Sequence, residues 1–262
     1  MKNKHLKNLF VALVFFFLYL PIIILIVFSF NTSKMNIIFE GFTFKWYNTL
    51  LHNRDLLEAF INTMIIAITS TVISTIIGTI GAVGLNKHNF PGKNLINKLI
   101  YIPIVIPEIV LGISLLSMYT LLKLELGMFT LILSHIAFSI PYVIVSVRST
   151  LSPLIKTYEE AAADLGANEF TTFLKITLPS IMPGVISGAT LAFTLSMDDV
   201  VISYFTAGPG SNTLPLKIYS IIKTGITPDV NALSTLMLLV TIIILTASAI
   251  NQSRKIAAGE VR

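Results

Sequence analysis

Hydrophobic residues fall in six long runs along the chain, each about as long as a membrane-spanning helix. A helix needs about 20 consecutive apolar residues to cross a hydrocarbon core of about 30 Å. Backbone groups cannot stay unpaired in lipid, and runs this long and continuous favour helices over barrel strands. The sequence therefore predicts an all-α integral membrane protein with six transmembrane helices, at residues 9–30, 59–85, 99–122, 128–147, 180–197 and 230–250.

Composition agrees with this pattern. The chain has 262 residues, of which 54% are hydrophobic and 12% charged, with a mean hydropathy of +0.83. It is too apolar for an ordinary soluble domain. The first apolar run is longer than that of a signal peptide and lacks a small-residue cleavage site. The chain has no cysteine, which excludes a disulfide framework, a thiolate metal site and a cysteine nucleophile.

The positive charges predict an orientation, because lysine and arginine stay on the cytoplasmic side of a membrane. With the N-terminus inside, most of the 18 Lys and Arg residues are cytoplasmic: Lys2, Lys4, Lys7, Lys87, Lys93, Lys98, Arg148, Lys156, Lys175, Arg254, Lys255 and Arg262. Both termini are thus predicted to be cytoplasmic, and residues 34–58 external. Topology accounts for the pI of about 9.3, so we expect the lipid bilayer and no nucleic acid as a partner.

Small residues recur at helical spacing in the second and fifth apolar runs. Each set lines one helix face: Ser70, Ser74, Gly78 and Ala82, and Gly184, Gly188, Ala192 and Ser196. Such faces let helix backbones approach closely in lipid. We expect packing within the chain, with contact to a second membrane subunit as the alternative.

The segment 148–179 is a long cytoplasmic connection with the pattern of two helices. Residues 158–165 are strong helix formers, and Gly166 is a natural stop after them. Asn168 can cap a second helix, which carries Glu169 in its first turn and ends before Pro179. An exposed helix pair is suited to contact a partner protein, and a solvated connector is the alternative.

The spacing of residues in this segment resembles a known signature. It has an acidic–alanine–alanine triplet, a glycine after three residues, and an Ile-x-Leu-Pro end after nine more: Glu160, Ala161, Ala162, Gly166, Ile176, Leu178 and Pro179. This is similar to the EAA signature of binding-protein-dependent ABC importer permeases. The resemblance implies that the helix pair couples to a cytoplasmic ATPase dimer. ATP and Mg²⁺ would bind that partner, since this chain has no Walker A sequence.

Further stretches resemble the spermidine/putrescine permeases of the PotC type within that family: residues 19–25, 41–47, 196–201 and 214–219. The resemblance implies a type I ABC importer permease fold in the bacterial inner membrane. Its core would be residues 60–248, preceded by a helix and external loop at 1–59 and followed by a tail at 249–262. It also implies a second homologous permease, an external polyamine-binding protein, and neither cofactor, metal nor enzymatic activity on this chain.

Three acidic residues lie in or next to apolar runs. Glu108 follows Pro103 and Pro107 inside the third run, and Asp198 and Asp199 follow the fifth. An acid at the bilayer centre costs about 2.5 kcal/mol or more, so it usually faces a bundle interior or a water-filled cavity. We expect a cation pathway here, with structural or interfacial acids as the alternative. Consecutive helical residues point about 100° apart, so at most one of Asp198 and Asp199 should face the pathway fully, and we expect it to be Asp198.

Other polar and aromatic residues allow different interpretations. His135 suggests a helix–helix hydrogen bond rather than a proton relay, and a serine–histidine dyad with Ser114 is the remote enzymatic alternative. Phe44, Trp46 and Tyr47 are expected to anchor the chain at the membrane interface, with binding-protein contact as the alternative. A permease for another small substrate and a stand-alone cation-coupled secondary transporter are the alternative functions.

Overall fold

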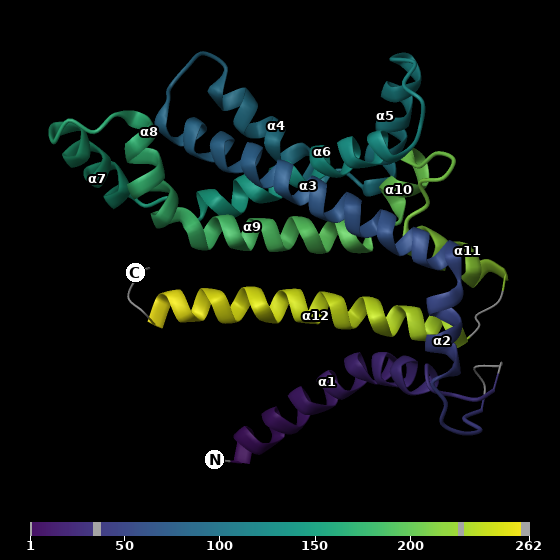
Figure 1. Cartoon of the computed structure of the whole chain (residues 1–262). Helices are drawn as coiled ribbons and strands as arrows, with labels where there is room; N and C mark the ends of the chain where they lie inside the picture. The colour runs from purple at the N-terminus through teal and green to yellow at the C-terminus, as the bar shows by residue number, and fades with distance from the viewer. Residues whose placement is uncertain (1, 34–37, 225–227, 258–262) are drawn as a thin grey trace. The chain divides into compact units, whose positions relative to one another are not determined.

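The computed structural model describes residues 2–33, 38–224 and 228–257, and most of them are helical (Figure 1). The elements are α1 (Lys2–Phe28), α2 (Lys45–His52), α3 (Arg54–Lys87), α4 (Lys93–Val105), α5 (Glu108–Leu121), α6 (Met128–Arg148), α7 (Pro153–Asp164), α8 (Glu169–Thr172), the π-helix η1 (Phe173–Thr177), α9 (Leu178–Asp198), α10 (Val201–Thr206), α11 (Leu214–Thr224) and α12 (Pro228–Ala257). The predicted all-α class is confirmed.

Five of the predicted spans coincide with long apolar helices. Within the described ranges, α1, α3, α6 and the continuous stretch Glu169–Asp198 are each long and apolar enough to cross a membrane, and α4 with α5 forms one bent pair. The sixth predicted span coincides with α12, whose described apolar stretch is the shorter Pro228–Ile243. The predicted count of six is therefore approximate. The predicted tail overlaps the end of α12, and its residues 258–262 lie outside the described part.

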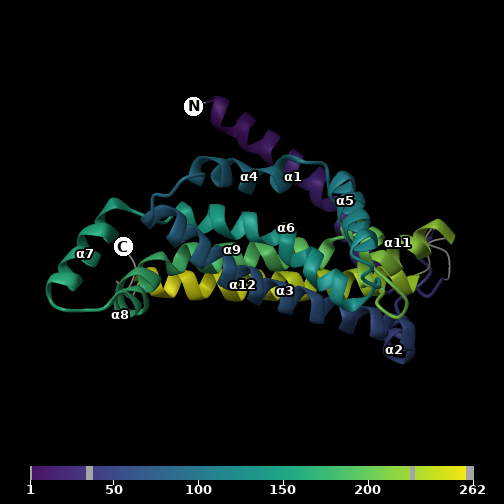
Figure 2. The same cartoon turned by 90° about the horizontal axis from the view of Figure 1, so that it is seen from above.

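The chain forms two compact units. One comprises Met1–Glu58 and Lys217–Ile242, and the other comprises Ala59–Leu216 and Ile243–Arg262. The second, larger unit contains both the acidic residues and the EAA segment. In this unit α7 and α8 gather at one end and α10 lies at the opposite end (Figure 1, Figure 2).

In the smaller unit, a tryptophan lies inside the fold rather than at a membrane interface. Trp46 is buried, and its indole N–H donates to the carbonyl of Asn31 at 2.5 Å. The hydroxyls of Tyr47 and Ser29 are 2.7 Å apart, while Phe44 is exposed. The predicted interface anchor is therefore wrong for Trp46, because local backbone groups satisfy its polar end.

In the larger unit, α6 packs against both α9 and the small-residue face of α3. A Cβ atom at Gly78 would lie 2.7 Å from the side chain of Val143. At Gly184 and Gly188 it would lie 2.9 Å from the carbonyl oxygen of Ser146 and 3.2 Å from Cα of Val143. Both faces thus bring helices of this chain together, which confirms the expected intrachain packing.

The third predicted span is broken rather than continuous. α4 and α5 meet at an angle of 111°. Pro107 precedes α5, and Ile106 before it is extended (φ −68°, ψ 137°). A proline disfavours the helical conformation in the residue before it and cannot donate a backbone hydrogen bond, so the helix ends here. Pro103, by contrast, is accommodated inside α4.

The helix that begins at Asn168 also differs from prediction, because it does not stop before Pro179. It continues through η1 into α9, and the Leu178 N–H donates to the carbonyl of Phe173, five residues earlier. Pro179 then falls in the first turn of α9, where a missing N–H is tolerated. One helix thus joins the cytoplasmic segment expected from sequence to the fifth span.

Candidate functional site

The acidic pair lies where α9 breaks and α10 begins. α9 ends at Asp198, and Asp199 has an extended backbone (φ −64°, ψ 125°) before α10 starts at Val201. The break gives the two neighbouring carboxylates different environments. Asp198 is exposed, whereas Asp199 is 9% exposed.

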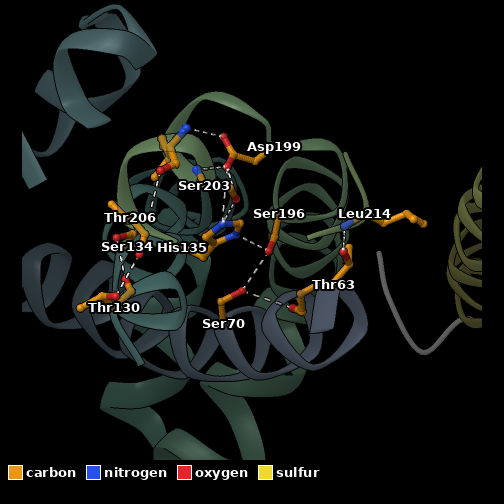
Figure 3. A network of polar contacts seen from close by, with 12 residues as sticks. Thr63, Ser70, Thr130, Ser134, His135, Ser196, Asp199, Ser203, Thr206 and Leu214 are labelled. Carbon is orange, nitrogen blue, oxygen red and sulfur yellow. Dashed lines mark hydrogen bonds and ion pairs between the residues drawn. The ribbon is translucent and has the colours of Figure 1, made fainter. Parts of the chain in front are cut away.

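The Asp199 carboxylate caps α10 (Figure 3). It accepts hydrogen bonds from the backbone N–H groups of Ile202 at 3.1 Å and Ser203 at 2.7 Å, and from the Ser203 hydroxyl at 2.7 Å. His135 Nε2 lies 3.5 Å from the same carboxylate oxygen. A carboxylate in this position satisfies helix N–H groups that would otherwise be unpaired.

His135 is the centre of a buried polar network that joins four helices (Figure 3). Its Nδ1 is 2.6 Å from the Ser196 hydroxyl on α9, and its Nε2 is 3.2 Å from the Ser203 hydroxyl on α10. Ser196 is in turn 3.2 Å from the Ser70 hydroxyl on α3. The expected helix–helix hydrogen bonding of His135 is confirmed. Ser114 is not its partner, because that hydroxyl donates to the Val110 carbonyl within α5.

The opposite end of α10 is also held by α6. The Thr130 hydroxyl donates to the Thr206 carbonyl at 2.9 Å. α10 packs against α5 as well, and the contact is close because a Cβ atom at Gly112 would lie 2.6 Å from the Phe205 ring. Six residues therefore form a helix whose two ends are both tied to neighbouring helices.

Glu108 is the first residue of α5, directly after the break at Pro107. Its side chain is exposed. The carboxylates of Asp199 and Glu108 both lie close enough to Asp198 for electrostatic repulsion. Glu108 and Asp198 are thus exposed acids beside two helix breaks, within electrostatic range of each other, while Asp199 belongs to the buried network.

The EAA segment forms the helix–turn–helix expected from sequence. Ser152 caps α7, its hydroxyl accepting from the Leu154 N–H at 3.3 Å. Gly166 has a φ of +85°, a left-handed conformation that glycine adopts without strain. The Asn168 side chain accepts from the Thr171 N–H at 2.8 Å and caps α8. The predicted glycine stop and asparagine cap are confirmed.

Residues of the EAA signature divide between the surface and the interior. Glu160, Ala161, Gly166 and Pro179 are exposed, Ile176 and Leu178 are half-buried, and Ala162 is 9% exposed. The sequence did not predict a role for the neighbouring Glu159, whose carboxylate accepts a hydrogen bond from the Thr177 hydroxyl. This bond ties α7 to the start of α9. In the sequence, only the position of Glu159, directly before the signature residue Glu160, could have pointed to this role.

α7 presents an apolar stripe to solvent. It consists of Leu154, Tyr158, Ala161 and Leu165, whose spacing of four, three and four residues places them on one helix face. The exposed fractions of Leu154, Tyr158 and Leu165 are 62%, 54% and 90%. The other side of α7 faces a cavity of about 680 Å³, lined in part by Lys87 and Ala163. Exposed apolar faces of this kind are typical of surfaces that bind a protein or a membrane.

Comparison with known proteins identifies the family. Residues 74–254 match the family described as the binding-protein-dependent transport system inner membrane component. This chain belongs to that family. It is a permease component of a transport system, and its relatives are transport subunits rather than enzymes. Among the described residues, no group of three or more His, Asp or Glu side chains could hold a metal ion.

Relatives that match the permease over most of their length are named as components of polyamine transport systems. It is 45% identical over 248 residues to the spermidine/putrescine transport system permease protein PotC of Escherichia coli K12, covering 95% of this chain and 94% of that protein. The putrescine transport system permease protein PotI of the same organism is 41% identical over 231 residues, covering 86% and 82%.

The fold of the permease also has solved counterparts. A bacterial ABC transporter that imports the acidic polysaccharide alginate matches with a TM-score of 0.74 at 17% identity, over 94% of each chain. At this identity the match concerns the fold alone. It agrees with the predicted type I permease fold.

Proposed function

We propose that this permease imports polyamines, spermidine or putrescine, across the bacterial inner membrane, driven by ATP hydrolysis on a partner ATPase dimer. The extensive identity to permeases of polyamine transport systems supports this substrate class. The observation that carries the proposal is the pair of exposed carboxylates, Glu108 and Asp198, each of which lies beside a helix break in the apolar part of the chain.

The chemistry of this pair suits a flexible multiple cation. An isolated charge in low dielectric is very costly, so a cation in transit needs groups that replace its water. Glu108 and Asp198 are acceptors that carry negative charge and are free of the buried network. Binding must stay weak, because a pathway that held the cation tightly would not release it. Tight capture belongs to the external binding protein that we propose as a partner.

Neutral substitutions test the pathway. Glu108→Gln and Asp198→Asn keep size and hydrogen bonding but remove charge. We expect each to slow uptake of labelled spermidine or putrescine by about tenfold, since loss of one nearby charge is worth about 1.4 kcal/mol or more in a partly desolvated path. Glu125→Gln, at an exposed acid outside the helices, is the matched control. Normal uptake in the Glu108→Gln/Asp198→Asn double variant at normal expression would rule out this pathway.

We further propose that α7 and α8 dock the ATPase through the apolar stripe and Glu160. Leu165→Asp places a charge at the most exposed residue of the stripe, and Glu160→Lys reverses a charge on the cavity side of the same helix. Both should reduce ATPase recovered by pull-down of the detergent-solubilised permease, while membrane insertion is unchanged. Glu125→Lys, at an exposed acid between α5 and α6, is the control. Normal ATPase recovery with both variants would contradict the docking surface.

The proposed orientation places both termini and residues 148–179 in the cytoplasm. The native chain has no cysteine, so Asn168→Cys offers a single labelling site. An impermeant thiol reagent should label it in inverted membranes and not in intact cells. A second homologous permease completes the proposed pathway, and the exposed apolar surface of α1 is available to contact it.

A further inference from the structure

The polar network around His135 has features of a positioning device rather than of a transport pathway. The His135 side chain is fully buried, so it cannot touch a passing cation directly. Both of its ring nitrogens are engaged, one toward α9 and one toward α10. The residue therefore connects the two helices on either side of the α9–α10 break.

The donors and acceptors of the network are consistent with one direction of hydrogen bonding. Ser203 donates its hydroxyl hydrogen to Asp199, so it can only accept from His135 Nε2. With a neutral ring, Nδ1 is then an acceptor and Ser196 donates to it. The Ser196 oxygen lies 3.2 Å from the Ser70 hydroxyl, whose hydrogen is shared between Ser196 and the Ala67 carbonyl at 3.3 Å. Each member is satisfied, and a fully satisfied buried network is rigid.

The network ends beside the exposed acid of the proposed pathway. Asp199 is held by three hydrogen bonds and by the proximity of His135, and Asp198 is its neighbour in the chain. Fixing the backbone at Asp199 fixes where α9 ends, and hence the direction of the Asp198 side chain. The far end of α10 is held separately by Thr130, so the network acts at the near end of α10, next to the junction.

We propose that His135 is a positioning residue for transport: it clamps the α9–α10 junction through Ser196, Ser203 and Asp199 and thereby sets the direction of the exposed Asp198 carboxylate. The consequence for transport rests on the proposed polyamine pathway. The clamp itself is a property of the junction and can be measured without any substrate.

The direct test uses Asp198→Cys in the otherwise cysteine-free full chain in membranes. The rate of labelling by a cationic methanethiosulfonate reagent reports the position of this side chain. Adding His135→Phe, which keeps ring volume but removes both hydrogen bonds, should change the rate at least about fivefold. His135→Gln retains a donor and an acceptor and should remain within about twofold of the parent.

Two controls separate positioning from general loosening. Ser139→Ala removes another buried hydroxyl of α6, one without a hydrogen-bond partner among the described residues, and should leave the labelling rate unchanged. A cysteine introduced by Thr120→Cys on the exposed side of α5 should label at the same rate with and without His135→Phe. If His135→Phe does not accumulate, Ser196→Ala and Ser203→Ala replace it in the test, because each removes one of the two hydrogen bonds of His135.

An unchanged labelling rate at position 198 in His135→Phe, or in both serine variants, would overturn the clamp. A glutamine variant that behaves like phenylalanine, or an equal change at position 120, would also overturn it. Uptake is measured separately with Asp198 intact, and His135→Phe should then slow it as Asp198→Asn does. Full uptake in Asp198→Asn would contradict the proposed role of Asp198 in the polyamine pathway. The labelling rate would still show whether His135 fixes the position of this side chain.

Discussion

Two helix breaks in the larger unit have similar local chemistry in different surroundings. Between α7 and α8, Asn168 accepts a hydrogen bond from the Thr171 N–H. Between α9 and α10, Asp199 accepts from the N–H groups of Ile202 and Ser203. The first break is exposed, and its cap joins two residues only three positions apart. The second is buried, and its network includes His135, 61 positions before Ser196 and 68 before Ser203.

The difference reflects what is available to satisfy backbone and side-chain polar groups. In the exposed segment, water serves any group that a cap leaves unpaired, so a glycine and two capping side chains are sufficient. Inside the helix bundle there is no bulk water, so each backbone donor needs a partner within the protein. A break within a span therefore depends on residues brought from distant helices, and losing one of them should have a larger effect.

The largest effect is expected from Asp199→Ala. This change leaves three donors around the junction without their acceptor, at a cost of about 3 kcal/mol or more in the free energy of unfolding. The midpoint of thermal unfolding in detergent, followed by circular dichroism, should fall clearly. Asp199→Asn keeps one acceptor oxygen and should fall less. Equal midpoints for the alanine variant and the native chain would contradict the capping role.

The next effect concerns a glycine required for space. At Gly184, a Cβ atom would lie 2.9 Å from the backbone oxygen of Ser146 and also meet Thr150. Backbone cannot move aside easily, so Gly184→Ala should destabilise the chain by about 2 kcal/mol. Gly84→Ala is the matched control, because nothing lies within 4 Å of a Cβ there. A similar unfolding midpoint for the two variants would show that α6 and α9 are less tightly packed.

Gly166 is required for backbone conformation instead. Nothing lies within 4 Å of a Cβ at this position, but its φ is +85°. Gly166→Val should strain the turn by about 1–3 kcal/mol and reduce ATPase recovery in pull-down, with insertion unchanged. Asparagine tolerates this conformation, so Gly166→Asn should retain most ATPase binding. Equal loss for both variants would mean that the glycine is needed for contact rather than for its φ.

The smallest effect is expected at the exposed cap. Asn168→Ala removes one hydrogen bond to the start of α8 and should cost about 1 kcal/mol. The change should appear as faster hydrogen exchange at the Thr171 amide, and Asn168→Ser should restore protection. A loss of global stability as large as that of Asp199→Ala would remove the distinction between the two breaks.

Much of the fold was predictable because its signals are local. The apolar runs, the caps and the helix-stopping glycine act within a few residues, and the structure bears out the predicted class, the turn at Gly166 and the cap at Asn168. Local signals were misleading at two prolines. Pro107 separates two helices, whereas Pro179 lies within a continuous one, because neighbouring backbone conformation decides how a missing N–H is accommodated.

By itself, the sequence determined that the chain spans a membrane, that residues 148–179 form a helix pair, and that three acids stand in an apolar context. Only the tertiary structure decided how Asp198 and Asp199 differ. Helical geometry indicated only that at most one of the two would face the pathway, whereas burial of Asp199 depends on donors from α10 and on His135 of α6. The physical reason is that a carboxylate's role follows from its partners, and in a membrane bundle those partners come from distant segments.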